Sequence, residues 1–219
     1  MTRLALVRHG ETIWHAENRY AGSTDIPLSP RGLEQAEWLA EWAATADLAA
    51  IWVSPLLRAR ETAAPSERAT GIAARVDERL REIHFGKAEG LTNSQIEQSF
   101  PDAFAGFQSD PVSHPLPEGE DPRDVVRRAI ECFKDIQTAH PRGRVLVVTH
   151  NTLIRLALCQ LLGVPLSRYR TAFPMIANGA LSEIRLHDGS VSLLKLNSPL
   201  EADLAAHAAD EEDSADTPF

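Results

Sequence analysis

Short apolar runs alternate with helical patterns along most of this chain, and that alternation restricts the folds it can adopt. Apolar runs of strand length lie at residues 4–7, 49–53, 72–76 and 145–149. Helical patterns follow at residues 32–46, near 57–60, at 121–139 and at 151–162. This order predicts an α/β fold, a three-layer αβα sandwich with a mostly parallel central sheet. A hairpin at 180–196, turning at Asp188-Gly189, is expected to add an antiparallel edge.

One domain is expected over residues 1–197, with a small cap insertion at about 88–122 that is rich in proline. Residues 198–219 read as an acidic, disordered tail. The tail holds seven acidic residues and no Lys or Arg, so the net charge of −9 becomes −2 without it. The nearly neutral body argues against nucleic-acid binding. No apolar stretch is long enough to span a membrane, and two cysteines in helical segments favour reduced thiols and a cytoplasmic location.

Reactive side chains follow each of the four apolar runs. Arg8 and His9 follow the first run, Arg58 the second, Glu82 the third and His150 the fourth. Because the carboxyl ends of parallel strands meet at one edge of a sheet, we expect these side chains to converge. Two arginines would repel a metal cation, so a metal site is not expected. The same set suits an anion with several oxygens, such as phosphate.

Four motifs in this order resemble the signature of the histidine phosphatase, or phosphoglycerate mutase-like, superfamily, in its phosphatase branch. The similarity covers roughly residues 3–195. Its motifs are Arg8-His9-Gly10-Glu11-Thr12 with Trp14, residues 54–63 beginning Ser54-Pro55-Leu56-Leu57-Arg58, Leu80-Arg81-Glu82, and Val148-Thr149-His150. A single Arg-His-Gly triplet carries little weight, whereas four motifs at the expected α/β positions are specific.

The resemblance implies a mechanism without metal or cofactor. His9 is expected to attack phosphorus and form a phosphohistidine. Glu82 is expected to protonate the leaving oxygen and then to deprotonate water. The remaining three catalytic candidates, Arg8, Arg58 and His150, are expected to offset charge on the phosphate oxygens. The expected partner is a small-molecule phosphomonoester, and a homodimer is left open.

Five further residues are predicted to bind substrate: Thr12, His15, Gly22, His84 and Asn151. His15 stands where the family usually has an asparagine. A charged histidine donates a stronger hydrogen bond, so we expect activity to rise at low pH. Asn151 stands at a position that is commonly glycine, and its side chain is expected to narrow the pocket.

Departures from the family pattern favour a phosphatase over a mutase. Mutases have Glu-Arg-His-Tyr-Gly where this chain has residues 82–86, Glu-Ile-His-Phe-Gly, which removes a cation and a hydroxyl. Residues 88–122 contain no Lys or Arg but seven acidic residues: Glu89, Glu97, Asp102, Asp110, Glu118, Glu120 and Asp121. An acidic cap is poorly suited to hold the bisphosphorylated, carboxylated intermediate of a mutase.

Three alternatives remain beside a general phosphomonoesterase. The first is a cofactor-dependent phosphoglycerate mutase. The second is an α-ribazole phosphatase, which residues 80–83, 85–86 and 89–92 resemble, although the Gly-Glu-Ser usual in that subfamily is Gly119-Glu120-Asp121 here. The third is a catalytically silent module that binds a phosphorylated ligand, against which the intact set of catalytic candidates argues.

Overall fold

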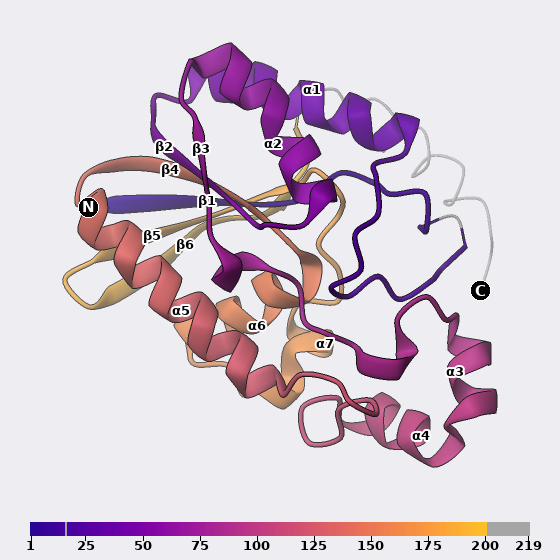
Figure 1. The fold of residues 1–219 in the computed structure, drawn as a ribbon. Helices are drawn as coiled ribbons and strands as arrows, with labels where there is room; N and C mark the ends of the chain where they lie inside the picture. The colour runs from indigo at the N-terminus through magenta and orange to yellow at the C-terminus, as the bar shows by residue number, and fades with distance from the viewer. Residues whose placement is uncertain (16, 201–219) are drawn as a thin grey trace, which may run out of the picture.

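A six-stranded sheet organises the molecule in the computed structural model, which describes residues 1–15 and 17–200 (Figure 1). In sheet order the strands are β3 (Ala74–Val76), β2 (Leu48–Val53), β4 (Gly143–Thr149), β1 (Thr2–Arg8), β5 (Leu181–His187) and β6 (Ser190–Ser198). The first four are parallel to one another, while β5 and β6 are antiparallel and form the predicted hairpin edge. The predicted acidic tail lies outside the described residues from residue 201 onward.

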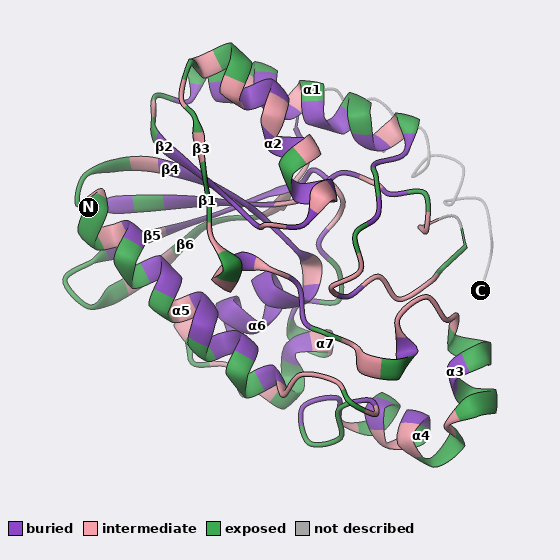
Figure 2. Cartoon of the chain, viewed as in Figure 1, coloured by how far each residue is buried: buried purple, intermediate pink, exposed green. Residues whose placement is uncertain are grey.

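Strand β4 sits inside the sheet because its apolar residues cover both faces. Val145 and Val147 belong to the apolar cluster on one face, and Leu146 and Val148 to the cluster on the other. Successive side chains of a strand point to opposite faces, so a continuous apolar run serves two layers at once. Figure 2 shows the central strands buried along most of their length.

Helices cover both faces of the sheet, as the sequence predicted (Figure 1). One face is covered by α1 (Pro30–Thr45) and α2 (Leu57–Thr70). The other is covered by α5 (Pro122–Ala139) and α6 (Asn151–Leu162), with the short α7 (Tyr169–Ala172) beside α6. The architecture is therefore the predicted αβα sandwich.

Local chemistry sets the element boundaries. Helix α1 begins at Pro30 because the Ser29 hydroxyl accepts from the Gly32 N–H, and Asp121 caps α5 in the same way. Strand β3 is two residues shorter than predicted. The preceding backbone is held instead by side chains, since the Ile72 N–H donates to the Thr70 hydroxyl. The 3₁₀ turn Leu166–Arg168 and helix α7 were not predicted.

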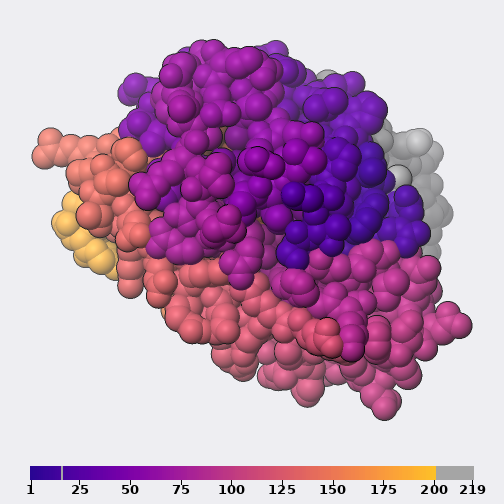
Figure 3. Space-filling view, in the orientation of Figure 1, coloured from indigo at the N-terminus to yellow at the C-terminus, as the bar shows by residue number. Residues whose placement is uncertain are grey.

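The segment predicted as a cap contains two short helices, α3 (Asn93–Ser99) and α4 (Pro101–Ser109). A small apolar cluster of its own holds it together, formed by Ala88, Ile96, Phe104, Phe107 and Leu116. Backbone hydrogen bonds join it to the N-terminal loop: Tyr20 N–H donates to Leu91 C=O, and Gly90 N–H to Tyr20 C=O. Figure 3 shows this magenta segment packed against the indigo N-terminal part of the chain.

None of the helices within residues 1–15 and 17–200 is long and apolar enough to cross a membrane. Cys132 and Cys159 are both buried and free, as predicted for reduced thiols.

Candidate active site

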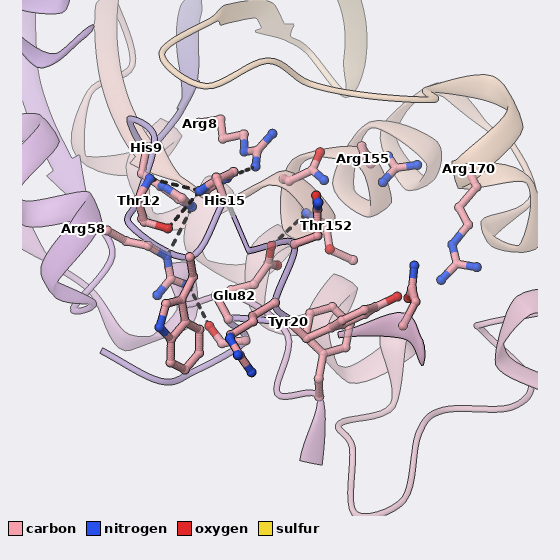
Figure 4. A pocket seen from close by; sticks show the side chains of 18 of the residues that line it. Arg8, His9, Thr12, His15, Tyr20, Arg58, Glu82, Thr152, Arg155 and Arg170 are labelled. Carbon is pink, nitrogen blue, oxygen red and sulfur yellow. Dashed lines mark hydrogen bonds between the residues drawn. The ribbon is translucent and has the colours of Figure 1, made fainter. Parts of the chain in front are cut away.

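A cavity of about 540 Å³ opens beyond the carboxyl ends of β1 and β4, the sheet edge at which the sequence predicted a site (Figure 4). It is lined by eight of the ten predicted site residues: Arg8, His9, Thr12, His15, Gly22, Arg58, Glu82 and Asn151. His150 lies behind this lining, and His84 lies outside it.

The hydrogen bonds of His9 define its chemistry. Its side chain is only 5% exposed, and its Nδ1 lies 2.7 Å from the Gly10 carbonyl oxygen, so Nδ1 carries the proton. Nε2 is left as the lone-pair nitrogen, 3.2 Å from Arg58 Nε, which donates to it. Burial, together with the charges of Arg58 and Arg8, lowers the pKa of His9 well below its ordinary value. His9 is therefore a neutral imidazole with an unprotonated Nε2.

Arg58 is fully buried and links His9 to the loop of residues 22–24. Its Nη2 donates to Gly22 C=O at 2.6 Å and its Nη1 to Thr24 C=O at 2.9 Å. Glu89 holds the same loop from the other side, accepting from the Ser23 N–H at 2.8 Å and the Thr24 hydroxyl at 2.6 Å. Gly22 adopts a φ of +49°, and a Cβ there would lie 2.0 Å from Glu89 Oε1. The loop is thus held between a guanidinium and a carboxylate.

Arg8 retains an unsatisfied donor. Its Nη1 donates to Ile176 C=O at 2.6 Å and its Nη2 lies 2.7 Å from His15 Nε2. Its Nε is buried and has no partner among the residues that the structure describes. Burial lowers the pKa of this guanidinium to about 10, so it remains charged at neutral pH. A buried cation with a free donor is suited to bind an anionic oxygen.

Glu82 reaches the cavity from the loop after β3 and is held by the first turn of α6. One carboxylate oxygen accepts from the Thr152 N–H at 3.0 Å and the other from the Leu153 N–H at 3.1 Å. Helix N-termini favour negative groups, because their first N–H groups have no partner within the helix. These contacts fix the direction of the carboxylate, which is 6% exposed (Figure 4).

His150 lies directly behind His9. The two ring centroids are 5.1 Å apart, and His150 is fully buried. Its Nε2 is 2.7 Å from the Ser54 hydroxyl, while its Nδ1 has no partner in the described part of the chain. Burial and the charge of Arg58 lower its pKa well below the ordinary value. A direct contact between His150 and phosphate stays a prediction.

His15 differs from what its position predicted. Its Nδ1 accepts from the Thr12 N–H at 2.9 Å, and its Nε2 faces the Arg8 guanidinium. Burial and the charge of Arg8 lower its pKa to about 4. The charged form, on which we based the expectation of higher activity at low pH, is therefore disfavoured at mildly acidic pH in the protein without substrate. The rise in activity at low pH stays a prediction.

Of two other predicted substrate contacts, Asn151 lines the cavity and His84 does not. The Asn151 side chain lines the cavity and accepts from the Ile176 N–H at 3.3 Å. His84 is exposed, and its Nδ1 accepts from the Gly86 N–H at 2.8 Å instead of facing the cavity. A substrate contact by His84 has no support in this geometry.

Sequence reasoning missed the wall formed by Arg155 and Arg170, together with the aromatic side chains Tyr20, Phe85 and Phe107. One signal was available, because Arg155 interrupts the otherwise apolar run of residues 153–159. No comparable local pattern marks Arg170.

The argument from an acidic cap is wrong. None of the seven acidic residues between 88 and 122 lines the cavity. Glu89 holds the loop of residues 22–24, and Glu120 pairs with Arg128 at 2.9 Å. Composition records how many charges a segment carries but not where they point.

The described residues contain no group of three or more His, Cys, Asp and Glu placed to hold a metal ion.

The sequence and the fold of this chain are similar to those of known proteins. A sequence model of the histidine phosphatase superfamily (branch 1) matches residues 4–199. Phosphoserine phosphatase 1 of Hydrogenobacter thermophilus is 31% identical over 197 residues, 90% of this chain and 92% of that protein. Glucosyl-3-phosphoglycerate phosphatase of Mycobacterium tuberculosis is 33% identical over 175 residues, 76% of this chain and 78% of that protein. The structure of Bacillus stearothermophilus YhfR matches with a TM-score of 0.85 at 34% identity, over 90% of this chain and 98% of its own.

Proposed function

We propose that this chain, which belongs to branch 1 of the histidine phosphatase superfamily, hydrolyses small phosphorylated metabolites through a phosphohistidine on His9. One observation carries the proposal: His9 is neutral, and its unprotonated Nε2 lies at the cavity beside the Arg58 guanidinium. A neutral imidazole is the nucleophilic form, and an adjacent fixed cation attracts the phosphate group. The relatives named as phosphatases for phosphoserine and for glucosyl-3-phosphoglycerate support the same substrate class.

In the first step, His9 Nε2 attacks phosphorus and the bond to the leaving oxygen breaks. Glu82, in its protonated form, gives its proton to that oxygen, so that an alcohol departs. Arg8 and Arg58 offset the charge on the non-bridging oxygens. The hydrogen bond from Nδ1 to Gly10 C=O stabilises the ring as its other nitrogen becomes bonded to phosphorus.

In the second step, Glu82 acts as the base. Its carboxylate takes a proton from water, whose oxygen attacks phosphorus while the bond to Nε2 breaks. Phosphate leaves, His9 is again neutral and Glu82 again carries a proton. The net reaction adds one water to a phosphomonoester and needs no metal.

A phosphoglycerate mutase is the second candidate, and Arg155 and Arg170 are the observation that favours it. A mutase holds an intermediate with several negative groups, and these two cations line the cavity. Against it, Phe85 lines the cavity without the hydroxyl of the mutase tyrosine, and Ile83 is buried in the core in place of the mutase arginine. Conversion of 3-phosphoglycerate in an assay coupled to enolase decides between the two.

Hydrolysis of p-nitrophenyl phosphate in the presence of a chelator tests the proposal. We expect turnover by the wild type, no turnover by His9→Ala and wild-type turnover by His187→Ala, whose side chain is exposed at the end of β5. A brief incubation should add one phosphoryl group to the peptide that contains His9. Equal rates for His9→Ala and wild type, or an absolute need for added metal, contradict the mechanism.

A further inference from the structure

Two arginines form the side of the cavity away from Arg58. Arg155 comes from α6 and Arg170 from α7, and Figure 4 shows both on the opposite side of the cavity from Arg58. Within residues 1–15 and 17–200, neither has a carboxylate within ion-pair distance. Neither takes part in the proposed phosphoryl transfer.

Two nitrogens of the Arg155 guanidinium, Nη1 and Nη2, have donors available for a ligand. It is 8% exposed, its Nε donates to Phe173 C=O at 2.6 Å, and its guanidinium lies 4.8 Å from the centre of the Tyr169 ring. No described residue accepts a hydrogen bond from its Nη1 or Nη2. These contacts fix the plane of the guanidinium while leaving its two outer nitrogens available, which is the geometry that binds a carboxylate or phosphate in a bidentate manner.

Arg170 is fixed in a similar way. Its Nε lies 3.2 Å from the Tyr169 hydroxyl and its Nη1 donates to Phe107 C=O at 3.1 Å, which ties α7 to the cap helix α4. Its guanidinium lies 4.4 Å from the centre of the Phe107 ring. Nη2 has no acceptor in the described part of the chain. Two preorganised cations therefore face the same cavity.

The charges that line the cavity do not balance. Among the residues that the structure describes, Glu82 is the single acidic residue that lines the cavity, and the first turn of α6 already holds it. A third outer arginine, Arg19, is paired with Glu17 at 2.6 Å. A phosphate dianion beside His9 would match the cations near it but leave Arg155 and Arg170 uncompensated. Arg155 is buried and Arg170 is partly buried. A cation with little access to water is costly without a counter-charge, so the missing negative charge is expected on the substrate.

We propose that Arg155 and Arg170 form a second anion subsite, so that the substrate is a phosphomonoester whose alcohol part carries another negative group, a carboxylate or a second phosphate. This inference rests on the proposed function, which places the transferred phosphate at His9. A cavity of about 540 Å³ has room for such a molecule. The aromatic side chains between the two cationic regions would contact its carbon skeleton.

Matched substrates test the subsite. 3-Phosphoglycerate and glycerol 3-phosphate differ only in a carboxylate against a hydroxymethyl group. Propane-1,3-diol bisphosphate and 3-hydroxypropyl phosphate differ in a second phosphate. We expect kcat/KM for phosphate release to be about tenfold or more higher for the anionic member of at least one pair, mostly through KM, and the pair that shows the preference identifies the second group.

Three variants assign the preference to residues. In Arg155→Gln and Arg170→Gln the ratio of kcat/KM between the two members of the pair should fall about tenfold, and Arg155→Lys should restore part of it. Arg168→Gln is the matched control, because Arg168 is exposed, lies two residues from Arg170 and does not line the cavity. The ratio compares two substrates on one protein, so partial misfolding of a variant does not change it.

Two results would overturn the second anion subsite. A wild-type protein that treats both members of both pairs alike overturns the subsite, as does a ratio that neither glutamine variant changes. Calorimetric binding of the same compounds to His9→Ala separates this proposal from the catalytic one. If no phosphate is released by the wild type but 3-phosphoglycerate or the bisphosphate still binds more tightly than its neutral partner, the subsite stands and the phosphatase is wrong.

Discussion

The histidines of the site differ because the partners of their ring nitrogens differ. In His9 the Gly10 carbonyl oxygen engages Nδ1, which leaves Nε2 unprotonated and accepting from Arg58. In His150 the Ser54 hydroxyl engages Nε2, and the remaining nitrogen is buried. In His15 one nitrogen accepts a backbone N–H and the other faces a guanidinium. One side-chain type thus provides the proposed nucleophile, a buried neighbour of it, and a residue that lies between Arg8 and Thr12.

Glu82→Gln tests the proton transfer assigned to this carboxylate. Glutamine retains the size of the side chain but cannot protonate a leaving oxygen. The leaving group of an alkyl phosphate is an alkoxide, a strong base that needs a proton as it departs, so hydrolysis of an alkyl phosphate should slow by about 10²–10⁴-fold. p-Nitrophenolate is a much weaker base and can leave without a proton, so the hydrolysis of p-nitrophenyl phosphate should slow much less.

Steady-state rates on glycerol 3-phosphate and p-nitrophenyl phosphate provide the measurement, and thermal unfolding of the variant serves as the control for folding. An equal loss for both substrates would assign Glu82 a role in holding α6 instead of in proton transfer.

At the scale of elements, the loop of residues 22–24 lies between Arg58 and Glu89, and its position depends on one glycine. Gly22 and Gly71 both have positive φ, +49° and +72°. A Cβ on Gly71 meets nothing within 4 Å, whereas on Gly22 it meets Glu89 Oε1 at 2.0 Å. An alanine at either position would have the backbone strain of a positive φ. Only at Gly22 would its Cβ also clash with Glu89.

Gly71→Ala should therefore lose only the strain of a left-handed residue, about 1–2 kcal/mol of unfolding free energy, and keep its activity. Gly22→Ala should lose more stability and also reduce kcat/KM, because displacing Glu89 or the loop moves the carbonyl groups that position Arg58. Urea unfolding and p-nitrophenyl phosphate kinetics on both variants measure the difference. Similar behaviour of the two proteins would show that Glu89 does not fix this loop.

Elements with a regular period were predictable from the sequence. The apolar runs of β1, β2 and β4 are explained by burial on both faces, and Asp121 with Pro122 marks the start of α5. Helix α7 has only four residues, too few to show a period, and tertiary contacts place it. The residues at the strand ends were predictable for the same reason as the strands, since topology alone brings them to one edge.

The distal wall of the cavity could not be predicted in this way. Arg170 comes from the unpredicted α7, and the aromatic residues come from the N-terminal loop, the loop before the cap and the cap itself. Their meeting depends on how the cap packs, which no local pattern encodes. The acidic composition of the cap was misleading for the same reason, because Glu89 and Glu120 are used inside the fold.

At the scale of the whole molecule, net charge and site charge have opposite signs. The chain carries a net charge of −9, yet most of the charged residues that line its cavity in the described part of the chain are arginines. The sheet makes this separation possible, because cations at the carboxyl ends of its strands are held by backbone carbonyl groups such as Gly22 and Ile176. An anionic substrate is therefore attracted locally by a protein that repels anions at long range.

The neutral histidines of the site also make stability depend on pH. Burial lowers the pKa of His9, His150 and His15, the last to about 4, so the folded protein leaves them unprotonated at mildly acidic pH. The unfolded chain protonates histidine near pH 6.5. Because the unfolded state then binds more protons, stability falls as pH decreases from about 6.5 toward 4, by at most about 1.4 kcal/mol per pH unit for each histidine.

His15→Asn isolates one of these three contributions. Asparagine does not titrate, so the unfolding free energy of the wild type minus that of the variant should be constant above about pH 7.5 and should decrease as pH falls below about 6.5. Contributions from all other groups cancel in the difference when the sites are independent. Urea unfolding of both proteins from pH 8 to pH 5 measures it, and the plateau at high pH is the internal control. A difference that stays constant, or grows, as the pH falls would mean that His15 takes up a proton in the folded protein as readily as in the unfolded chain.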